Sequence, residues 1–184
     1  MKRVAFILGV LDDNDVDWLT EAGQRQELQP GQTLIREGEP SDYIYLILDG
    51  GLKVSVAALE DQPVAHLATG EVVGEMSFVD RQPPSATVSA LDPSVVLAIP
   101  YAQLRHKLQH DVWFASRFYR ALAILLSSRL RSTVKHLEGE HQRPVVSLNE
   151  AGIDEMNDLL SMGSIRFDGL LKRLRDANPN PWEE

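Results

Sequence analysis

The residues whose types are best suited to binding a ligand lie in one run, from Gly74 to Val88. In this run a Gly-Glu pair precedes two prolines and several small residues. Gly74 can turn the backbone sharply and let a ligand approach closely. The carboxylate of Glu75 can accept a hydrogen bond from a sugar hydroxyl. As an acid at the start of a short helix, Glu75 can equally well stabilise the helix dipole. The residue types leave both interpretations of Glu75 open.

The second half of this run could approach a phosphate. Ser85 and Ala86 are small, so their backbone N–H groups could come within hydrogen-bonding distance of a phosphate oxygen, and the Ser85 hydroxyl adds a donor. Ser77 lies one turn into the short helix, where its hydroxyl or N–H could face a ligand. Thr87 has mainly strand character and is a weaker candidate. The predicted ligand-binding residues are Gly74, Glu75, Met76, Ser77, Ser85, Ala86 and Thr87.

Changes of hydrophobic period divide the chain into the elements that must position these residues. Asp12 to Gly23 has helical spacing with acidic residues near its start. Short apolar or β-rich runs, separated by glycine turns, then continue to Pro100 and predict an all-β sandwich or barrel. The predicted strands are Gln26–Leu28, Thr33–Arg36, Tyr43–Leu48, Leu52–Ala57, Val64–Ala68, Glu71–Val73, Ser85–Leu91 and Val95–Ile99.

Two predicted helices follow, a short one from Tyr101 to Gln109 and a long one from Asp111 to about Gly139. The long helix has more apolar positions than one buried stripe needs, so we expect it to be covered on more than one side. One side would lie on the sandwich, and another could meet its copy in a homodimer. Alternatively, the C-terminal tail folds back over it. The predicted dimer face consists of Leu126, Leu130, Val134 and Leu137.

The tail carries two predicted short helices, Glu150–Leu160 and Arg166–Arg175. From Val145 onward, eight acidic residues outnumber four basic ones, whereas a DNA-binding surface needs the opposite sign. We therefore expect no nucleic-acid binding by the tail. The predicted organisation is a domain over residues 1–139, including the long helix, and a helical tail over residues 140–184.

From Leu11 to about Leu137 the chain resembles the cyclic nucleotide-binding domain family, in particular the effector domain of catabolite-activator-type bacterial regulators. Four blocks in the family's order carry the resemblance: Leu28–Gly38, Asp42–Gly50, Gly74–Phe78 and Pro83–Val88. The resemblance implies a mainly β fold, a jelly-roll β-sandwich with flanking helices, and a long C-terminal helix that closes over the pocket and often dimerises. It also implies a ribose contact for Glu75 and cAMP or cGMP as the ligand. Nothing after Gly139 resembles the winged helix-turn-helix of such regulators.

Pro84 departs from the family pattern, which places at this position an arginine that neutralises the cyclic phosphate. Pro84 offers neither a charge nor an N–H group. Because a charge-assisted hydrogen bond contributes about 1.5–3 kcal/mol, we expect binding weaker by about one to two orders of magnitude or more. Arg81 could act as a surrogate cation, although an exposed loop charge is the preferred interpretation. Ser132 and Thr133 on the long helix are weaker candidates for contacts with the base.

Composition limits the classes of function. A net charge of −9 argues against a broad nucleic-acid-binding surface, and the absence of cysteine excludes disulfides, thiolate metal sites and cysteine nucleophiles. The apolar run Val4–Leu11 is too short to span a membrane and is poorly shaped as a secretory signal. We therefore expect a buried N-terminal segment and a cytoplasmic protein.

Other chemical constellations are weak. His106 and His110 have the spacing of a helical metal pair, but no Glu follows His106 as in zinc proteases, and a helix-end histidine pair is the preferred interpretation. We find no nucleophile elbow, phosphate loop or paired carboxylates, and so expect neither an enzyme nor a metal site. Three hypotheses remain: a sensor that signals to a partner, an interaction module with a non-binding pocket, and a transcription regulator, which the charge of the tail disfavours.

Overall fold

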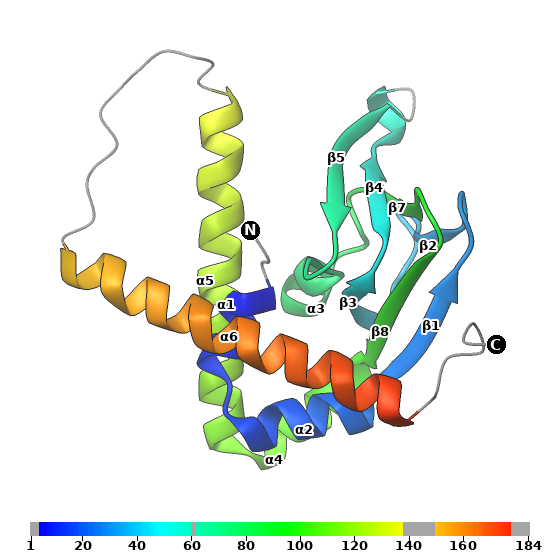
Figure 1. The fold of residues 1–184 in the computed structure, drawn as a ribbon. Coiled ribbons are helices and arrows are strands. Elements are labelled where there is room, and N and C mark those ends of the chain that lie inside the picture. The colour runs from blue at the N-terminus through cyan, green and yellow to red at the C-terminus, as the bar shows by residue number, and fades with distance from the viewer. Residues whose placement is uncertain (1–3, 60–61, 138–149, 178–184) are drawn as a thin grey trace.

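Two four-stranded antiparallel sheets packed face to face form the centre of the computed structural model, which describes residues 4–59, 62–137 and 150–177 (Figure 1). The sheets have the orders β1-β8-β3-β6 and β2-β7-β4-β5. All eight predicted strands are present, with ends that differ by a few residues, and the predicted jelly-roll sandwich is confirmed. The strands are β1 (Gln24–Leu28), β2 (Thr33–Ile35), β3 (Tyr43–Asp49), β4 (Gly51–Ser55), β5 (Pro63–Ala68), β6 (Val72–Val73), β7 (Thr87–Ala90) and β8 (Ser94–Pro100).

Strand β3 shows why one sheet is buried on both faces. Successive side chains of a strand point to opposite faces. Tyr45 and Ile47 therefore pack between the two sheets, whereas Ile44 and Leu46 belong to the core that the sheet shares with the helices. The continuous apolar sequence of β3 follows from this double burial.

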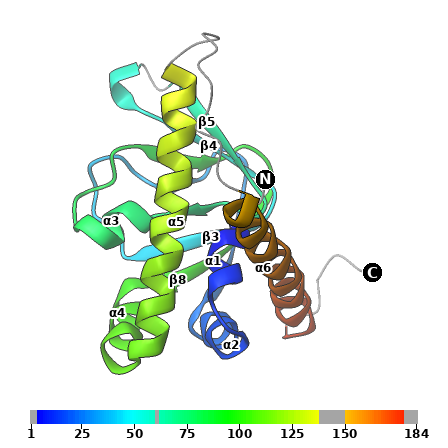
Figure 2. The same ribbon diagram turned by 90° about the vertical axis from the view of Figure 1, so that its left-hand side faces the viewer.

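Helices cover the outer face of that sheet (Figure 2). Within the described ranges, none of them is long and apolar enough to cross a membrane. The predicted buried N-terminal segment is confirmed, because α1 lies between α5 and α6 with most of its apolar side chains buried. The helices are α1 (Val4–Val10), α2 (Asp13–Ala22), α3 (Glu75–Asp80), α4 (Tyr101–His110), α5 (Val112–Leu137) and α6 (Glu150–Ala177), and a 3₁₀ turn, η1, spans Ala57–Leu59.

Helix α5 packs its inner face on the sandwich and on α1. Phe114, Phe118 and Leu125 are buried on this face. On the predicted dimer face, Leu126 is half-buried and Leu130 and Val134 are exposed; the side chain of Leu137 lies outside the described residues. Helix α6 packs chiefly on α1 rather than over this face of α5.

The described part of the tail, residues 150–177, forms one helix, so the prediction of two short helices is wrong. Gly163, which lies in the expected break, is buried inside α6 where it crosses α1. A Cβ atom at Gly163 would lie 1.9 Å from the carbonyl oxygen of Ala5. Glycine is present here because the two helix backbones approach closely, and it does not interrupt the helix. Phe167 and Leu170 of α6 join the same core as α1 and α5.

Arginines attach α6 to the N-terminal helices. The Arg166 side chain pairs with Asp13 at 2.7 Å and donates to the carbonyl oxygen of Leu8 at 3.0 Å, at the C-terminal end of α1. Arg173 pairs with Asp17. The described part of the tail is therefore packed on the N-terminal helices, and the boundary between residues 139 and 140 lies in a segment outside the described residues.

The crossing of α6 over α1 predicts unequal effects of alanine at two glycines of the same helix. Gly163→Ala should destabilise the protein by about 1–3 kcal/mol, because the new methyl group meets the backbone of Ala5. Gly169→Ala is the matched control: its Cβ would meet nothing within 4 Å, so better helix propensity should stabilise by up to about 1 kcal/mol. Urea unfolding of both variants tests this, and equal effects would contradict the close crossing.

Candidate ligand-binding site

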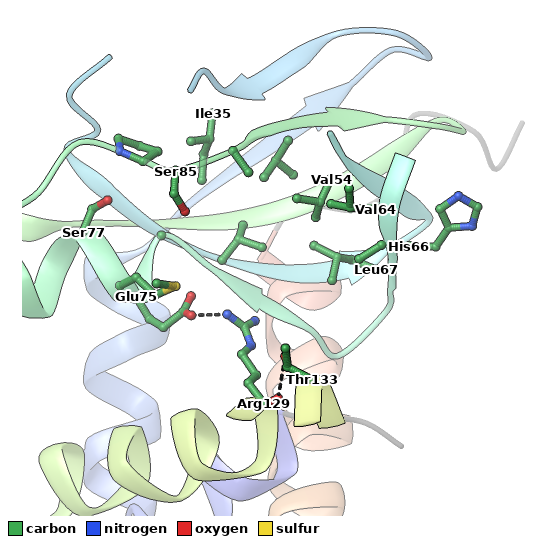
Figure 3. A pocket seen from close by; sticks show the side chains of 17 residues that line it. Ile35, Val54, Val64, His66, Leu67, Glu75, Ser77, Ser85, Arg129 and Thr133 are labelled. Carbon is green, nitrogen blue, oxygen red and sulfur yellow. Dashed lines mark hydrogen bonds and ion pairs between the residues drawn. The ribbon is translucent and has the colours of Figure 1, made fainter. Parts of the chain in front are cut away.

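A cavity of about 600 Å³ lies between the sandwich and α5 (Figure 3). Its residues come from β2, β4, β5, β6, the turn between β6 and α3, α3 itself, the loop before β7, β7 and α5. The walls are largely aliphatic and are formed by Ile35, Val54, Val64, Ala65, Leu67, Val73 and Val88. The polar and charged side chains in the lining are His66, Glu75, Ser77, Ser85, Arg129 and Thr133. A cavity with apolar walls and a few polar groups is typical of small-molecule sites.

The turn between β6 and α3 is fixed by backbone geometry. Gly74 has φ +86°, and a Cβ atom there would lie 2.5 Å from the carbonyl oxygen of Tyr43. The hydroxyl of Tyr101 donates to the Gly74 carbonyl at 2.6 Å. Burial raises the pKa of Tyr101 to about 12, so the hydroxyl keeps the proton that it donates. The turn thus places Glu75 at the first position of α3.

The position of Glu75 is compatible with both roles that the sequence left open. It begins α3, and its carboxylate lines the cavity with only 1% of the residue exposed. Its Oε1 pairs with Nη1 of Arg129, which reaches it from α5 (Figure 3). The Nη2 of Arg129 donates to the carbonyl oxygen of Val72. These contacts join α5 to the β6–α3 turn across the edge of the cavity.

The loop before β7 supplies small groups and no charge. Pro84, Ser85 and Ala86 all line the cavity. The carbonyl oxygen of Pro84 accepts a hydrogen bond from the N–H of Gly38 at 2.8 Å. Because this bond uses the backbone of residue 84, its geometry does not depend on a particular side chain at that position.

Most of the residues predicted from the sequence come together in the cavity, but two of the described ones do not. Gly74, Glu75, Met76, Ser77, Ser85, Ala86 and Thr133 all line it. Thr87 lies outside the lining, and its Oγ1 accepts instead from the N–H of Glu37 at 3.1 Å. Arg81 also lies outside it, as an exposed residue that ends α3 with φ +60°. The side chain of Ser132 is outside the described residues.

Arg129 is the functional candidate that the sequence analysis missed. A signal was present, because Arg129 continues the inward stripe of Phe118, Leu122 and Leu125 at helical spacing. A charged residue on an otherwise buried helix face indicates a specific partner. The partner was not identifiable, because Glu75 is far away in the sequence.

The histidine pair has no part in this site. His106 and His110 belong to α4, and their rings stack with centroids 4.1 Å apart. The Nδ1 of His110 lies 2.8 Å from the carbonyl oxygen of His106. Neither residue is in the cavity lining, and their assignment as a plain helix-end pair stays a prediction.

Comparison with known proteins identifies the domain. Residues 25–111 match the family model described as "Cyclic nucleotide-binding domain". A solved structure titled as the N-terminal domain of a transcriptional regulator from Streptomyces coelicolor is 27% identical, with a TM-score of 0.58 over 75% of this chain and 93% of that chain. A cyclic nucleotide-binding domain from Methylobacillus flagellatus shares the fold at 23% identity and a TM-score of 0.66, over 78% and 86% of the two chains. Residues 25–111 therefore form a domain of the cyclic nucleotide-binding domain family.

Curated relatives are similar over part of their length. A cGMP-dependent protein kinase of Eimeria tenella is 36% identical over 81 residues, which is 44% of this chain and 8% of the kinase. An uncharacterized NTE family protein of Mycobacterium tuberculosis is 32% identical over 120 residues, 65% of this chain and 20% of that protein. This chain thus spans a fifth or less of the length of these two relatives.

The close packing of the turn at Gly74 predicts a stability difference between two glycines with similar positive φ angles. Gly74→Ala and Gly38→Ala both force alanine into the left-handed region, which costs about 1–2 kcal/mol. At Gly38 the new methyl group meets nothing within 4 Å, whereas at Gly74 it meets the backbone of Tyr43. Gly74→Ala should therefore destabilise by about 1–3 kcal/mol more than Gly38→Ala. Urea unfolding measures the difference, and equal losses would contradict the turn geometry.

Proposed function

We propose that this protein is a sensor whose domain binds cAMP or cGMP weakly or with altered specificity and signals the binding to a partner. The observation that carries the proposal is the buried carboxylate of Glu75, which lines the same cavity as Ser85 and Ala86 in a domain of this family. A carboxylate can hold a sugar hydroxyl, and the small residues leave their N–H groups accessible to a phosphate. Pro84 has no charge and no N–H group, so it cannot strengthen the contact with the phosphate.

Helix α5 is the proposed route of signalling, because it contacts the cavity and also presents an unpaired apolar face. Arg129 and Thr133 line the cavity. On the outer side, Tyr119, Ala123 and Leu130 are exposed, and together with Leu126 they have the alternating four- and three-residue spacing of a coiled coil. This spacing supports a homodimer through α5, in which a change at the cavity would reach the second subunit. The acidic tail supports a protein partner rather than a nucleic acid.

An interaction module with an unoccupied pocket is the second candidate, and one observation favours it. The carboxylate of Glu75 already has a partner in Arg129, so the charge of Glu75 is balanced without a ligand. In this case the protein acts by binding another protein through the apolar face of α5. It regulates that partner without binding a nucleotide or catalysing a reaction.

Titration calorimetry with cAMP and cGMP separates the two candidates. Pro84→Arg should raise the affinity by about tenfold to a hundredfold, because a charge-assisted hydrogen bond contributes about 1.5–3 kcal/mol. Pro83→Arg is the matched control, since Pro83 is exposed and is not in the cavity lining, and it should leave the affinity unchanged. Micromolar or tighter binding by the wild type would contradict a weakened site. Undetectable binding by the wild type and by Pro84→Arg would favour the interaction module.

Sedimentation analysis tests the dimer. Leu130→Glu places a charge in the middle of the apolar face, where Leu130 is 65% exposed in the single chain, and should convert dimers into monomers. Ile165→Glu is the control, because Ile165 on α6 is 66% exposed but lies on another helix, and it should leave the mass unchanged. A monomeric wild type, or a Leu130→Glu variant that keeps the dimer mass, would rule out this interface.

A further inference from the structure

We infer that Arg129 of α5, and not a residue of the sandwich, supplies the cation that binds the phosphate of the cyclic nucleotide, an inference that rests on the proposed function. Among the described residues that line the cavity, Arg129 is the one with a permanent positive charge. Arg81 is outside the lining, and Pro84 is uncharged. A cyclic phosphate keeps its negative charge, and burying an anion without a cation is strongly unfavourable. The ligand therefore needs Arg129.

The guanidinium is already held in place for this role. Its Nη1 pairs with Glu75 (Figure 3), and its Nη2 donates to the carbonyl oxygen of Val72, so both contacts are with the β6–α3 wall. The third donor atom, Nε, is buried and has no hydrogen-bond partner within the described part of the chain. A buried donor without a partner is unfavourable. An acceptor oxygen that reached Nε would remove that penalty.

Glu75 can serve the sugar and Arg129 at the same time. A carboxylate offers about four acceptor sites on its two oxygens, and the pair with Arg129 uses Oε1. A ribose hydroxyl that donates to Oε2 therefore need not displace the arginine. In a cyclic nucleotide, the free hydroxyl and the phosphate are attached to neighbouring carbons of the ribose. One sugar can thus present its hydroxyl to Glu75 and its phosphate to the guanidinium beside it.

Because Arg129 belongs to α5, the negative charge of the phosphate would contact this helix directly. A cation on the loop before β7 would hold the phosphate within the sandwich. Arg129 instead belongs to the helix that exposes Leu130 one residue later. Binding of the phosphate then changes the contacts of α5 itself, so site occupancy and the outer face of the helix are linked through one side chain.

A purely structural role for Arg129 gives different results, and the nucleoside adenosine distinguishes the two. Adenosine keeps the ribose hydroxyls and the base but lacks the phosphate. If Arg129 only shaped the cavity, its replacement would weaken cAMP and adenosine alike. If Arg129 binds the phosphate, its replacement weakens cAMP and leaves adenosine unchanged.

The experiment is a calorimetric titration of the full chain with cAMP and with adenosine, for the wild type and a set of variants. Arg129→Gln should weaken cAMP by about tenfold to a hundredfold without changing the affinity for adenosine. Arg131→Gln, an exposed arginine of the same helix outside the cavity lining, is the control and should bind like the wild type. Arg129→Lys retains a cation and should keep most of the preference for cAMP, which guards against a Gln variant that fails to fold.

A double substitution completes the test. If the two positions offer alternative cations, Arg129→Gln should cost much less in the background of Pro84→Arg than in the wild type, because their effects are coupled. Equal losses for cAMP and adenosine, or no loss for either, would overturn the role of Arg129. If Pro84→Arg bound cAMP but the wild type did not, the role of Arg129 would also be overturned. The cavity would still be a cyclic nucleotide pocket of the family type. Failure of both proteins to bind cAMP or cGMP would instead overturn the proposed function, on which this inference rests.

Discussion

The ion pair between Glu75 and Arg129 is the constraint on which the cavity depends. A carboxylate that is 1% exposed is strongly unfavourable unless it has a partner. Arg129 supplies that partner from α5, and the carbonyl of Val72 orients it. The path of α5 past the cavity is therefore tied to the turn that begins α3. Helices α3 and α5 are distant in sequence, but each supplies one charge of this ion pair. The wall of the cavity depends on that pairing.

A second set of charges holds the helical layer together. Helix α2 carries several acidic residues and no basic one. Its acidic side chains form ion pairs with arginines of both α5 and α6. Arg117 of α5 binds Asp15 with two contacts of 2.6 and 2.9 Å, which raises the pKa of Arg117, while Arg166 and Arg173 reach α2 from α6. Exposed pairs contribute little stability, so burial of apolar side chains in α6 supplies most of its attachment. The charges fix which face of α6 meets the N-terminal helices.

The sandwich could be predicted from the sequence because its information is local. Glycine turns and short β-rich runs mark all eight strands, and the run from Gly74 to Ala86 brings most of its predicted residues to the cavity. What could not be predicted depends on contacts between distant residues. Gly163 resembles a break in a helix until the backbone of Ala5 is seen against it. Arg129 resembles an ordinary helix charge until its partners on the β6–α3 turn are known.

The hydrogen bond between the Gly38 N–H and the Pro84 carbonyl has a consequence for adaptation of the protein. Since the carbonyl oxygen of residue 84 anchors this loop, the side chain at position 84 can vary while this backbone contact is retained. In a sensor of the proposed kind, a change of this one residue would shift the ligand concentration at which the protein responds. If the protein is the sensor proposed above, selection can adjust its dose–response range separately from the scaffold, and proline at position 84 would set a high threshold within that range.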